Sequence, residues 1–411
     1  MTFEQFNLHP HITTAIHEQS YSCPTPIQHQ AIPHILNGRD VMGLAQTGTG
    51  KTAAFVLPLL QHLVQKPGRR VRALILSPTR ELAAQTHDSI RALGRYTRVR
   101  STVIFGGVNM NPQIEALKRG TDIVVACPGR LLDHIAQGHI DLSALQTLIV
   151  DEADRMFDMG FLPDLRRIVR QLPAQRQTLL FSATMPDEIR HLATDVLKNA
   201  VTVQVDHTKP VEAIAHALYP VPQHLKTALL KVLLKKTATD SVIVFTRTKH
   251  RAKRLAEQLN RSGFRATSLQ GNLSQNQRQH AISGFREGAY QILVATDIAA
   301  RGIDVAAVSH VINYDMPDTA DAYTHRIGRT GRISRSGEAF TFVTGEDKAM
   351  ILAIEQTLGE KIRRVTLPDF DYAKAPEKQE RPAQAARTQP RPRAAKQATG
   401  ENKRSVPRRY S

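Results

Sequence analysis

Short runs of aliphatic and β-branched residues alternate along most of this chain with segments of helical periodicity, such as residues 80–94. This alternation predicts parallel β-sheets covered by helices on both faces. The strand-like runs of the first half are 40–45, 72–79, 101–106, 122–128, 147–152 and 177–184, and those of the second half are 241–248, 291–297, 309–315 and 338–344. The pattern is therefore typical of an α/β protein with two doubly wound domains.

The alternation pauses once and then stops before the end of the chain. Residues 206–222 contain prolines and show no period, so we expect an interdomain linker there, between domains at 1–205 and 223–370 with a cleft between them. Residues 371–411 carry eleven Lys and Arg against four Asp and Glu, with almost no large apolar residues. Such a segment buries too little surface to offset its ordering entropy, which predicts a disordered basic tail.

The overall charge indicates a polyanionic partner. The chain has 55 Lys and Arg against 37 Asp and Glu, a formal net charge of +18. Neutralisation of phosphates by Lys and Arg is the main source of nucleic-acid affinity, although solubility alone is the alternative interpretation.

Composition also limits the classes of site and location. The two cysteines, Cys23 and Cys127, lie in no C-x-x-C pair and near no metal-spaced histidines, so we expect no zinc site. No apolar run is long enough for a membrane span, and the first residues lack the pattern of a secretory signal. We therefore expect a cytoplasmic protein.

A glycine-rich turn at residues 45–52, AQTGTGKT, follows a predicted strand and opens a helical segment. It fits the phosphate-binding pattern G-x-x-x-x-G-K-[ST], except that Ala45 replaces the first glycine. Gly48 and Gly50 allow the backbone amides to approach phosphate oxygens closely. Lys51 would reach the β- and γ-phosphates of a nucleotide and Thr52 would bind Mg²⁺, whereas the alternative is a turn with no ligand.

Three carboxylates follow the apolar run that ends at Val150. Asp151, Glu152 and Asp154 repel one another unless a cation or a reaction uses them. Asp151 is placed to hold Mg²⁺ through water, and Glu152 to orient and deprotonate an attacking water. A helix N-terminus also favours acidic residues, but it accounts for only one or two of them.

These motifs together resemble the DEAD-box RNA helicases, a family of superfamily 2, over residues 1–370. The resemblance rests on a series of segments in the family's order: AQTGTGKT (45–52), DEAD (151–154), SAT (182–184), PTPIQ (24–28), PTRELA (78–83), GG (106–107), PGR (128–130), ATDIAARGID (295–304) and HRIGRTGR (325–332). It implies two tandem RecA-like domains. The compact core with a short basic tail resembles the bacterial RhlE-type subgroup.

The resemblance implies a complete site for ATP with Mg²⁺. Gln28 would read the adenine edge, and Phe3 would stack on the adenine, with simple core packing as the alternative for both. Asp304 would contact the ribose. The nucleotide-binding set is completed by Gln46, Thr47, Gly48, Thr49, Gly50, Lys51, Thr52 and Gly302.

The resemblance also assigns residues to hydrolysis and to its coupling with domain closure. Arg329 and Arg332 match the arginine fingers, whose forked cations stabilise charge on the γ-phosphoryl oxygens. The residues that match the coupling network are Asp154, Ser182, Thr184 and His325. Without the other motifs, the R-x-G-R run would indicate only a solvated basic turn.

Strand-end loops of both domains would contact RNA through its sugar and phosphate groups, with little sequence preference. The matching residues are Arg80, Gly106, Gly107, Gly129, Arg130, Gln275, Arg278 and Thr296. Cys127 stands where the family usually has Thr. We expect this replacement to weaken the RNA contacts slightly, since a thiol is a weaker donor than a hydroxyl.

The implied activity is that of an ATP-dependent RNA helicase that closes on single-stranded RNA and separates short duplexes or remodels RNA–protein complexes. An ATP-gated RNA clamp is an alternative that the same motifs would serve, and a DNA-directed translocase is a further one. The expected oligomeric state is a monomer. Binding to a ribosome or an RNA-degradation complex is left open by the sequence.

Overall fold

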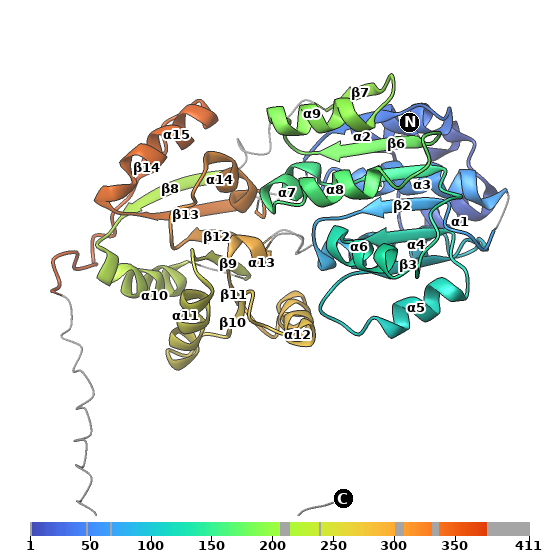
Figure 1. Ribbon diagram of the computed structural model, residues 1–411. Helices are drawn as coiled ribbons and strands as arrows, with labels where there is room; N and C mark the ends of the chain where they lie inside the picture. The colour runs from blue at the N-terminus through green and yellow to red at the C-terminus, as the bar shows by residue number, and fades with distance from the viewer. Residues whose placement is uncertain are drawn as a thin grey trace, which may run out of the picture. The chain divides into compact units, whose positions relative to one another are not determined.

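The structure, a computed structural model, describes residues 2–46, 48–65, 68–205, 214–237, 240–300, 308–330 and 337–375. Residues up to Tyr372 form one compact unit, and this unit contains two separate seven-stranded sheets (Figure 1). The predicted α/β fold with two parallel-sheet domains is confirmed.

The first sheet has the strand order β3-β4-β2-β5-β6-β1-β7, and all of its pairings are parallel. Its strands are β1 (Val41–Leu44), β2 (Ala73–Leu76), β3 (Ser101–Ile104), β4 (Ile123–Ala126), β5 (Thr147–Val150), β6 (Gln177–Ser182) and β7 (Val201–Gln204). Six of the seven coincide with runs predicted from the sequence. Because they are parallel, the loops that follow them lie at one edge of the sheet.

Helices cover both faces of the first sheet, because successive side chains of a buried strand point to opposite sides. Ala73 and Ile75 of β2 join one apolar cluster, and Leu74 and Leu76 join the other. The first cluster includes residues of η1 (Phe3–Phe6), α1 (Pro10–Glu18), α2 (Pro26–Leu36), α3 (Lys51–Val64) and α4 (Arg80–Leu93). The second includes residues of α6 (Pro128–Ala136), α7 (Ala153–Asp158), α8 (Leu162–Val169) and α9 (Asp187–Val196), whereas α5 (Asn111–Lys118) follows the edge strand β3.

The second sheet repeats this architecture with the order β10-β11-β9-β12-β13-β8-β14. Its strands are β8 (Ile214–Pro220), β9 (Val242–Phe245), β10 (Ala266–Leu269), β11 (Ile292–Ala295), β12 (His310–Asn313), β13 (Gly337–Val343) and β14 (Arg363–Arg364). The helical elements of this half are η2 (Gln223–Leu225), α10 (Lys226–Lys236), α11 (Lys249–Arg261), α12 (Gln275–Arg286), α13 (Asp297–Ala300), α14 (Ala320–Ile327), η3 (Gly345–Asp347) and α15 (Lys348–Leu358).

Two boundaries differ from those expected. Residues 214–220, inside the segment 206–222 expected to be a linker, form β8, which pairs with β13 and β14. Tyr372, inside the expected tail, packs against the core of the second sheet, and its hydroxyl accepts the Leu367 N–H at 3.0 Å. The rest of the predicted tail, residues 376–411, lies outside the described residues. In the part of the chain that the structure describes, no helix is long and apolar enough to cross a membrane.

Candidate active site and nucleic-acid interface

The predicted site residues of the first domain lie where the parallel strands end. The glycine-rich turn follows β1, Arg80 follows β2, Gly106 and Gly107 follow β3, residues 128–130 follow β4, the carboxylates follow β5, and Ser182 ends β6. In the strand order β5-β6-β1, the carboxylates and the glycine-rich turn are separated by one strand. Because neighbouring strands are about 4.8 Å apart, this arrangement leaves roughly 10 Å between the two loops.

The glycine-rich turn has the backbone that a phosphate-binding loop needs. Gly48 and Gly50 adopt φ angles of +89° and +91°, which glycine adopts without strain. The hydroxyl of Thr49 donates to the carbonyl of Gln46 at 2.7 Å and closes the turn. The helix α3 then starts at Lys51, so its free N–H groups face the loop.

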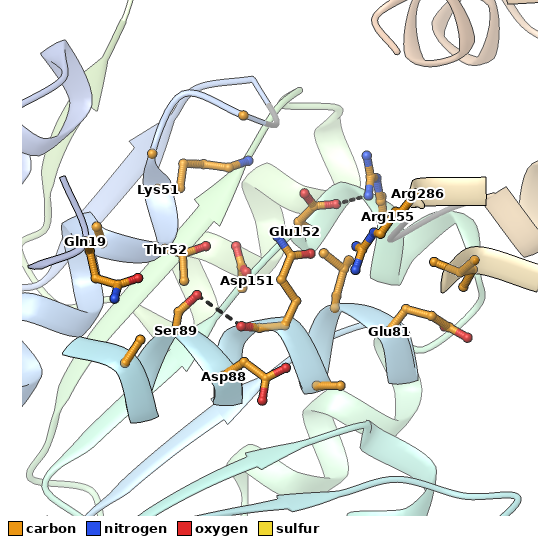
Figure 2. Close-up of a pocket in the computed structure, with 18 of the residues that line it drawn as sticks. Gln19, Lys51, Thr52, Glu81, Asp88, Ser89, Asp151, Glu152, Arg155 and Arg286 are labelled. Atoms are coloured by element: carbon orange, nitrogen blue, oxygen red, sulfur yellow. Dashed lines mark hydrogen bonds and ion pairs between the residues drawn. The ribbon is translucent and has the colours of Figure 1, made fainter. Parts of the chain in front are cut away.

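Lys51 and Asp151 are buried without partners for their charged atoms. Lys51 is 5% exposed and Asp151 is 4% exposed, and neither the Lys51 Nζ nor the Asp151 Oδ1 has a hydrogen-bond partner among the described residues. Both line a cavity of about 550 Å³, together with Thr52 and Glu152 (Figure 2). Burial, and then the neighbouring Glu152, raises the pKa of Asp151 to about 7. Unsatisfied buried charges of opposite sign on one cavity fit a ligand that carries both phosphates and a cation.

Glu152 is held in a conformation that is unusual for its residue type. Its φ and ψ angles of 55° and 54° lie in the left-handed region, which a non-glycine residue adopts only at a cost of about 1–2 kcal/mol. Its carboxylate forms an ion pair with the buried Arg155, one turn further along α7. The cost is therefore offset locally, and the carboxylate is fixed at the cavity wall beside Asp151.

The structure brings three of the four predicted coupling residues into one hydrogen-bonded network. The Asp154 Oδ2 accepts the Ala183 N–H at 3.2 Å, and the N–H and hydroxyl of Thr184 at 3.0 and 3.2 Å. The Ser182 hydroxyl accepts the Asp154 N–H at 3.2 Å and donates to the Thr184 carbonyl at 2.7 Å. The network joins the ends of β5 and β6.

His325, the fourth predicted coupling residue, lies on α14 and lines a small cavity with Arg155 and Arg329. Burial, followed by the Arg155 cation, lowers the pKa of His325, and Asp154 opposes this effect. The imidazole of the second domain is thus within electrostatic reach of the network in the first.

Arg329 also lines the large cavity with Lys51, Asp151 and Glu152, and it is 6% exposed. It follows α14, and Arg326 fixes this helix. The Arg326 guanidinium forms two bonds with Asp297, at 2.6 and 2.7 Å, and lies 5.1 Å from the ring centre of Phe245. A buried, bidentate arginine thus anchors the helix that carries His325 and that Arg329 directly follows.

The exposed aromatic ring that lines the cavity with Lys51 and Asp151 belongs to Tyr21, not to Phe3. Phe3 is 6% exposed and packs in the core, whereas Tyr21 is 39% exposed, lines the cavity and stacks on Phe3 with ring centres 6.2 Å apart. Gln28 is also buried: its Oε1 accepts the Thr25 N–H at 3.0 Å, and its Nε2 donates to the Gly50 carbonyl at 3.0 Å. In this conformation Phe3 packs against Tyr21 and Gln28 binds the glycine-rich turn, so both hold residues of the cavity wall in place.

The predicted RNA-contacting residues of the first domain form a compact group. The Arg80 guanidinium lies so close to Gly107 that a Cβ there would be 2.1 Å from Nη1, and Gly107 has a φ of +77°. The Arg130 guanidinium donates to the Val108 carbonyl at 3.3 and 3.4 Å. The loop with Gly106 and Gly107 is therefore held between two arginines, while Gly129 has open space around it.

The second domain contributes residues next to this group. Gln275 Oε1 accepts from Arg80 Nη1 at 3.3 Å, and the Arg278 guanidinium pairs with Glu81 at 2.8 and 2.9 Å. Thr296 follows β11, and its N–H is 3.4 Å from the Leu269 carbonyl. The predicted RNA contacts of the two domains thus meet where Arg80 contacts Gln275, and the ion pair of Arg278 with Glu81 lies beside this contact.

Cys127 precedes α6 as its N-cap residue, and its side chain makes no capping hydrogen bond. Burial, followed by Glu81, raises the pKa of the Cys127 thiol to about 12, so it is a neutral thiol at physiological pH. Four predicted site residues lie outside the described residues: Thr47, Gly302, Asp304 and Arg332.

Sequence reasoning missed several residues that the structure places at the site. Tyr21, Glu81, Arg155 and Arg326 make the contacts described above but were not assigned roles. A signal existed for two of them: Arg155 lies three residues after Glu152, the spacing of an ion pair on one helix face, and Tyr21 precedes the PTPIQ segment.

Comparisons with known proteins give consistent matches. Residues 25–192 match the DEAD/DEAH box helicase family, and residues 225–334 match the helicase conserved C-terminal domain. The DEAD-box ATP-dependent RNA helicase CshA of Bacillus subtilis is 42% identical over 374 residues, which cover 91% of this chain and 76% of CshA. The CshA of Geobacillus kaustophilus is 43% identical, with 90% of this chain and 80% of that protein covered.

Solved structures show the same fold. Saccharomyces cerevisiae Dbp5 bound to RNA and ADP BeF3 matches with a TM-score of 0.79 at 33% identity, and the match covers 89% of this chain and 95% of that one. A DEAD box protein from the hyperthermophile Methanococcus jannaschii matches with a TM-score of 0.52 at 38% identity, covering 89% of this chain and 99% of that one. The tandem RecA-like architecture is thereby confirmed, whereas the RhlE-type subgroup stays a prediction.

Proposed function

Because this chain belongs to the DEAD-box family of ATP-dependent RNA helicases, we propose that the cavity between the glycine-rich turn and the carboxylates binds and hydrolyses ATP with Mg²⁺. The observation that carries the proposal is a pair of buried ionisable atoms, the Lys51 Nζ and the Asp151 Oδ1, which lie on one cavity with Arg329 and have no hydrogen-bond partner in the part of the chain that the structure describes. Buried charges without partners are costly, so a ligand that satisfies both gains that energy on binding.

The nucleotide lies with its phosphates at the N-terminus of α3, where the free N–H groups and Lys51 favour anions. Its base stacks on Tyr21, the exposed ring on the cavity wall, and Phe3 supports that ring from the core. Gln28 reads the adenine only after it exchanges its bond to the Gly50 carbonyl for one to the base, because both ends of its amide are engaged.

Thr52 and Asp151 are the residues that would hold Mg²⁺ beside the phosphates. Magnesium usually keeps several waters and binds through one or two carboxylates plus substrate phosphates, which fits the buried Asp151 Oδ1, an atom without a hydrogen-bond partner among the residues described. When bound, the ion supplies positive charge that stabilises the phosphoryl oxygens in the transition state.

For hydrolysis, the carboxylate of Glu152 orients and deprotonates the attacking water. Its ion pair with Arg155 and its fixed backbone hold this carboxylate at the cavity wall. Arg329 stabilises the charge on the γ-phosphoryl group, and Arg332 is proposed as its second partner from the family resemblance alone. His325 and the network of Asp154, Ser182 and Thr184 couple hydrolysis to the position of the second domain.

RNA binds along the group formed by Arg80, Gly106, Gly107 and Arg130, with Gln275 and Arg278 contributed by the second domain. These side chains offer charged and amide groups that suit phosphates and 2′-hydroxyls. Since ATP and RNA both contact residues of the two domains, each ligand favours the same arrangement and raises affinity for the other.

We further propose that the protein separates short RNA duplexes locally. Strand separation of a duplex of about ten base pairs should require ATP or a nonhydrolysable analogue, and repeated turnover should require hydrolysis. The measurement is the release of a labelled strand by the parent and by Arg329→Lys, which keeps the charge but loses the fork. An ATP-gated clamp would instead retain single-stranded RNA for longer after ATP addition without releasing a strand, and that result would contradict unwinding.

A further inference from the structure

A second concave, strongly basic surface lies on the first domain, outside the proposed ATP and RNA sites. We define it as the basic cavity: a depression of about 680 Å³ between the C-terminal half of α4, the start of β3 and the end of α5. Its charged lining residues are Arg91, Arg95, Arg100 and Arg119, and no Asp or Glu of the described chain lines it. Ser101 and Thr102 contribute hydroxyl groups.

The arginines of the basic cavity are largely available to a ligand. All four are exposed. The Arg100 guanidinium donates to the backbone carbonyl of Arg119 at 3.2 Å, which holds it at the end of α5, and Arg95 makes a 3.5 Å contact with the exposed Glu18. Such an exposed, solvent-screened ion pair contributes little and yields readily to a phosphate.

A simpler explanation covers part of this arrangement. Arg91 lies in the last turn of α4 and Arg119 is the C-cap of α5, positions where a cation complements the helix dipole. This effect does not explain why four arginines line one depression in which no described lining residue is a carboxylate. Like charges gathered in this way are tolerated best where a polyanion binds.

The position of the basic cavity relative to the proposed RNA site indicates which polyanion it takes. The edge strand β3 starts at Ser101, in the cavity wall, and ends just before Gly106 and Gly107. Four residues of strand span roughly 13 Å, so a strand of nucleic acid that leaves the loop with Gly107 reaches the cavity within a few nucleotides.

We propose that the basic cavity is a second RNA-binding site, which holds the phosphodiester backbone of RNA flanking the segment bound in the main cleft. The proposal rests on RNA being the ligand of that cleft. The cavity contributes affinity without sequence preference, because arginines and hydroxyls that contact phosphate and sugar read no base edges. Long RNA therefore gains from the cavity, and RNA that only fills the cleft does not.

The test variant is the double substitution Arg91→Gln and Arg119→Gln in the full chain. Both side chains are exposed, and no hydrogen bond or ion pair of either side chain is present among the described residues, so the fold should tolerate their loss. The matched control is Arg167→Gln in α8 with Arg170→Gln at its C-cap, which removes the same charge from exposed side chains of the same domain. All proteins keep the basic tail, so its contribution cancels.

Binding is measured by fluorescence anisotropy with single-stranded RNA of about 8 and about 24 nucleotides, in a nonhydrolysable ATP analogue with Mg²⁺. Each phosphate contact contributes about 0.7 to the slope of log affinity against log salt for a single strand. The double variant should therefore lower this slope by about 1.4 for the long RNA. Between about 50 and about 200 mM salt, the parent should lose roughly sevenfold more affinity than the variant. The control should match the parent, and all should bind the short RNA equally.

Three outcomes would overturn the proposal. The first is equal salt slopes for the parent and the double variant on the long RNA, and the second is an equal loss of affinity of the double variant for both RNA lengths. The third is a double variant that binds both RNAs like the parent and loses binding only to an acidic polyglutamate peptide, tested as a separate probe. The last result would assign the cavity to an acidic protein. Failure of the proposed function has a different signature, because the parent itself would then show no binding of the short RNA that depends on the ATP analogue.

Discussion

Replacing Asp151 by Asn should stabilise the protein in the absence of nucleotide while it abolishes the response to ATP and Mg²⁺. The physical reason is the burial of the carboxyl group, which raises its pKa from 3.8 to about 7 in the folded protein. The folded state therefore holds the proton more tightly than the unfolded chain does. The cost of burying the charge is absent below pH 3.8, grows as the pH rises from 3.8 to 7, and is fully present above pH 7.

The size of this cost follows from the shift in pKa. A pKa raised from 3.8 to about 7 corresponds to roughly 4 kcal/mol, and water and relaxation around a buried charge lower the realised value to about 1–3 kcal/mol. Asparagine keeps the shape and cannot ionise, so Asp151→Asn removes the cost. For a domain of this size, each kcal/mol raises the melting temperature by about 2–4 °C.

The assay is thermal melting of the parent and of Asp151→Asn at about pH 5 and about pH 8, on either side of the raised pKa, with and without ATP and Mg²⁺. We expect the variant to melt higher than the parent without nucleotide, and the advantage to be larger at the higher pH than at the lower. The parent alone should gain stability from the ligand at the higher pH. A variant that is no more stable than the parent at the higher pH, or an advantage that does not change with pH, would refute the reasoning.

Three further predictions concern the nucleic-acid loop, the adenine contact and the tail. Gly107→Ala should displace the Arg80 guanidinium, because the added Cβ would lie 2.1 Å from it, and should weaken RNA affinity about tenfold. In the matched Gly106→Ala the added Cβ meets its nearest side chain at 3.9 Å, so this variant should lose far less RNA affinity. Equal RNA affinities for the two variants would disprove this prediction. Tyr21→Ala should raise the KM for ATP about tenfold through lost stacking, and Tyr21→Phe should not; a KM that is unchanged in the alanine variant would remove the stacking role. Deletion of residues 376–411 should weaken RNA binding and flatten its salt dependence with ATP binding unchanged, and identical salt slopes would rule out the tail as an electrostatic anchor.

The strands that were predicted are those with continuous apolar runs. β2, β4 and β5 are buried on both faces, as residues such as Ile75 and Val125 show, so they are visible in composition alone. The strands that were missed lack this signal: β7, with the sequence VTVQ, is mostly exposed, β10, with the sequence ATSL, has two polar residues at its centre, and β14 has two exposed arginines. The sequence of β8 did not indicate a strand, because it contains polar residues and ends at Pro220. Its structure is determined by its tertiary pairing with β13.

The candidate site was predictable where the chemistry is local in sequence. Lys51, Thr52, Asp151 and Glu152 follow directly from motifs with fixed spacing, and the structure brings them to one cavity. Roles that depend on side-chain packing were not predictable: which of two nearby aromatic rings is exposed depends on η1, which buries Phe3.

The same limit applies across the domains and to single side chains. The pairing of Arg278 with Glu81 joins residues 197 positions apart, a distance at which periodicity carries no information. The two hydrogen bonds of Gln28 likewise depend on where the loop with Gly50 lies after folding.

The central claim is that RNA stimulates ATP hydrolysis through Glu152 in the described cavity. The most direct test is the steady-state ATPase rate of the full chain with no nucleic acid, with single-stranded RNA and with DNA of the same sequence, beside the variant Glu152→Gln. We predict strong stimulation by RNA, little by DNA, and loss of the RNA-stimulated rate in the variant, with its ATP binding retained. Equal rates under all three conditions, or an RNA-stimulated rate that survives in Glu152→Gln, would contradict the account.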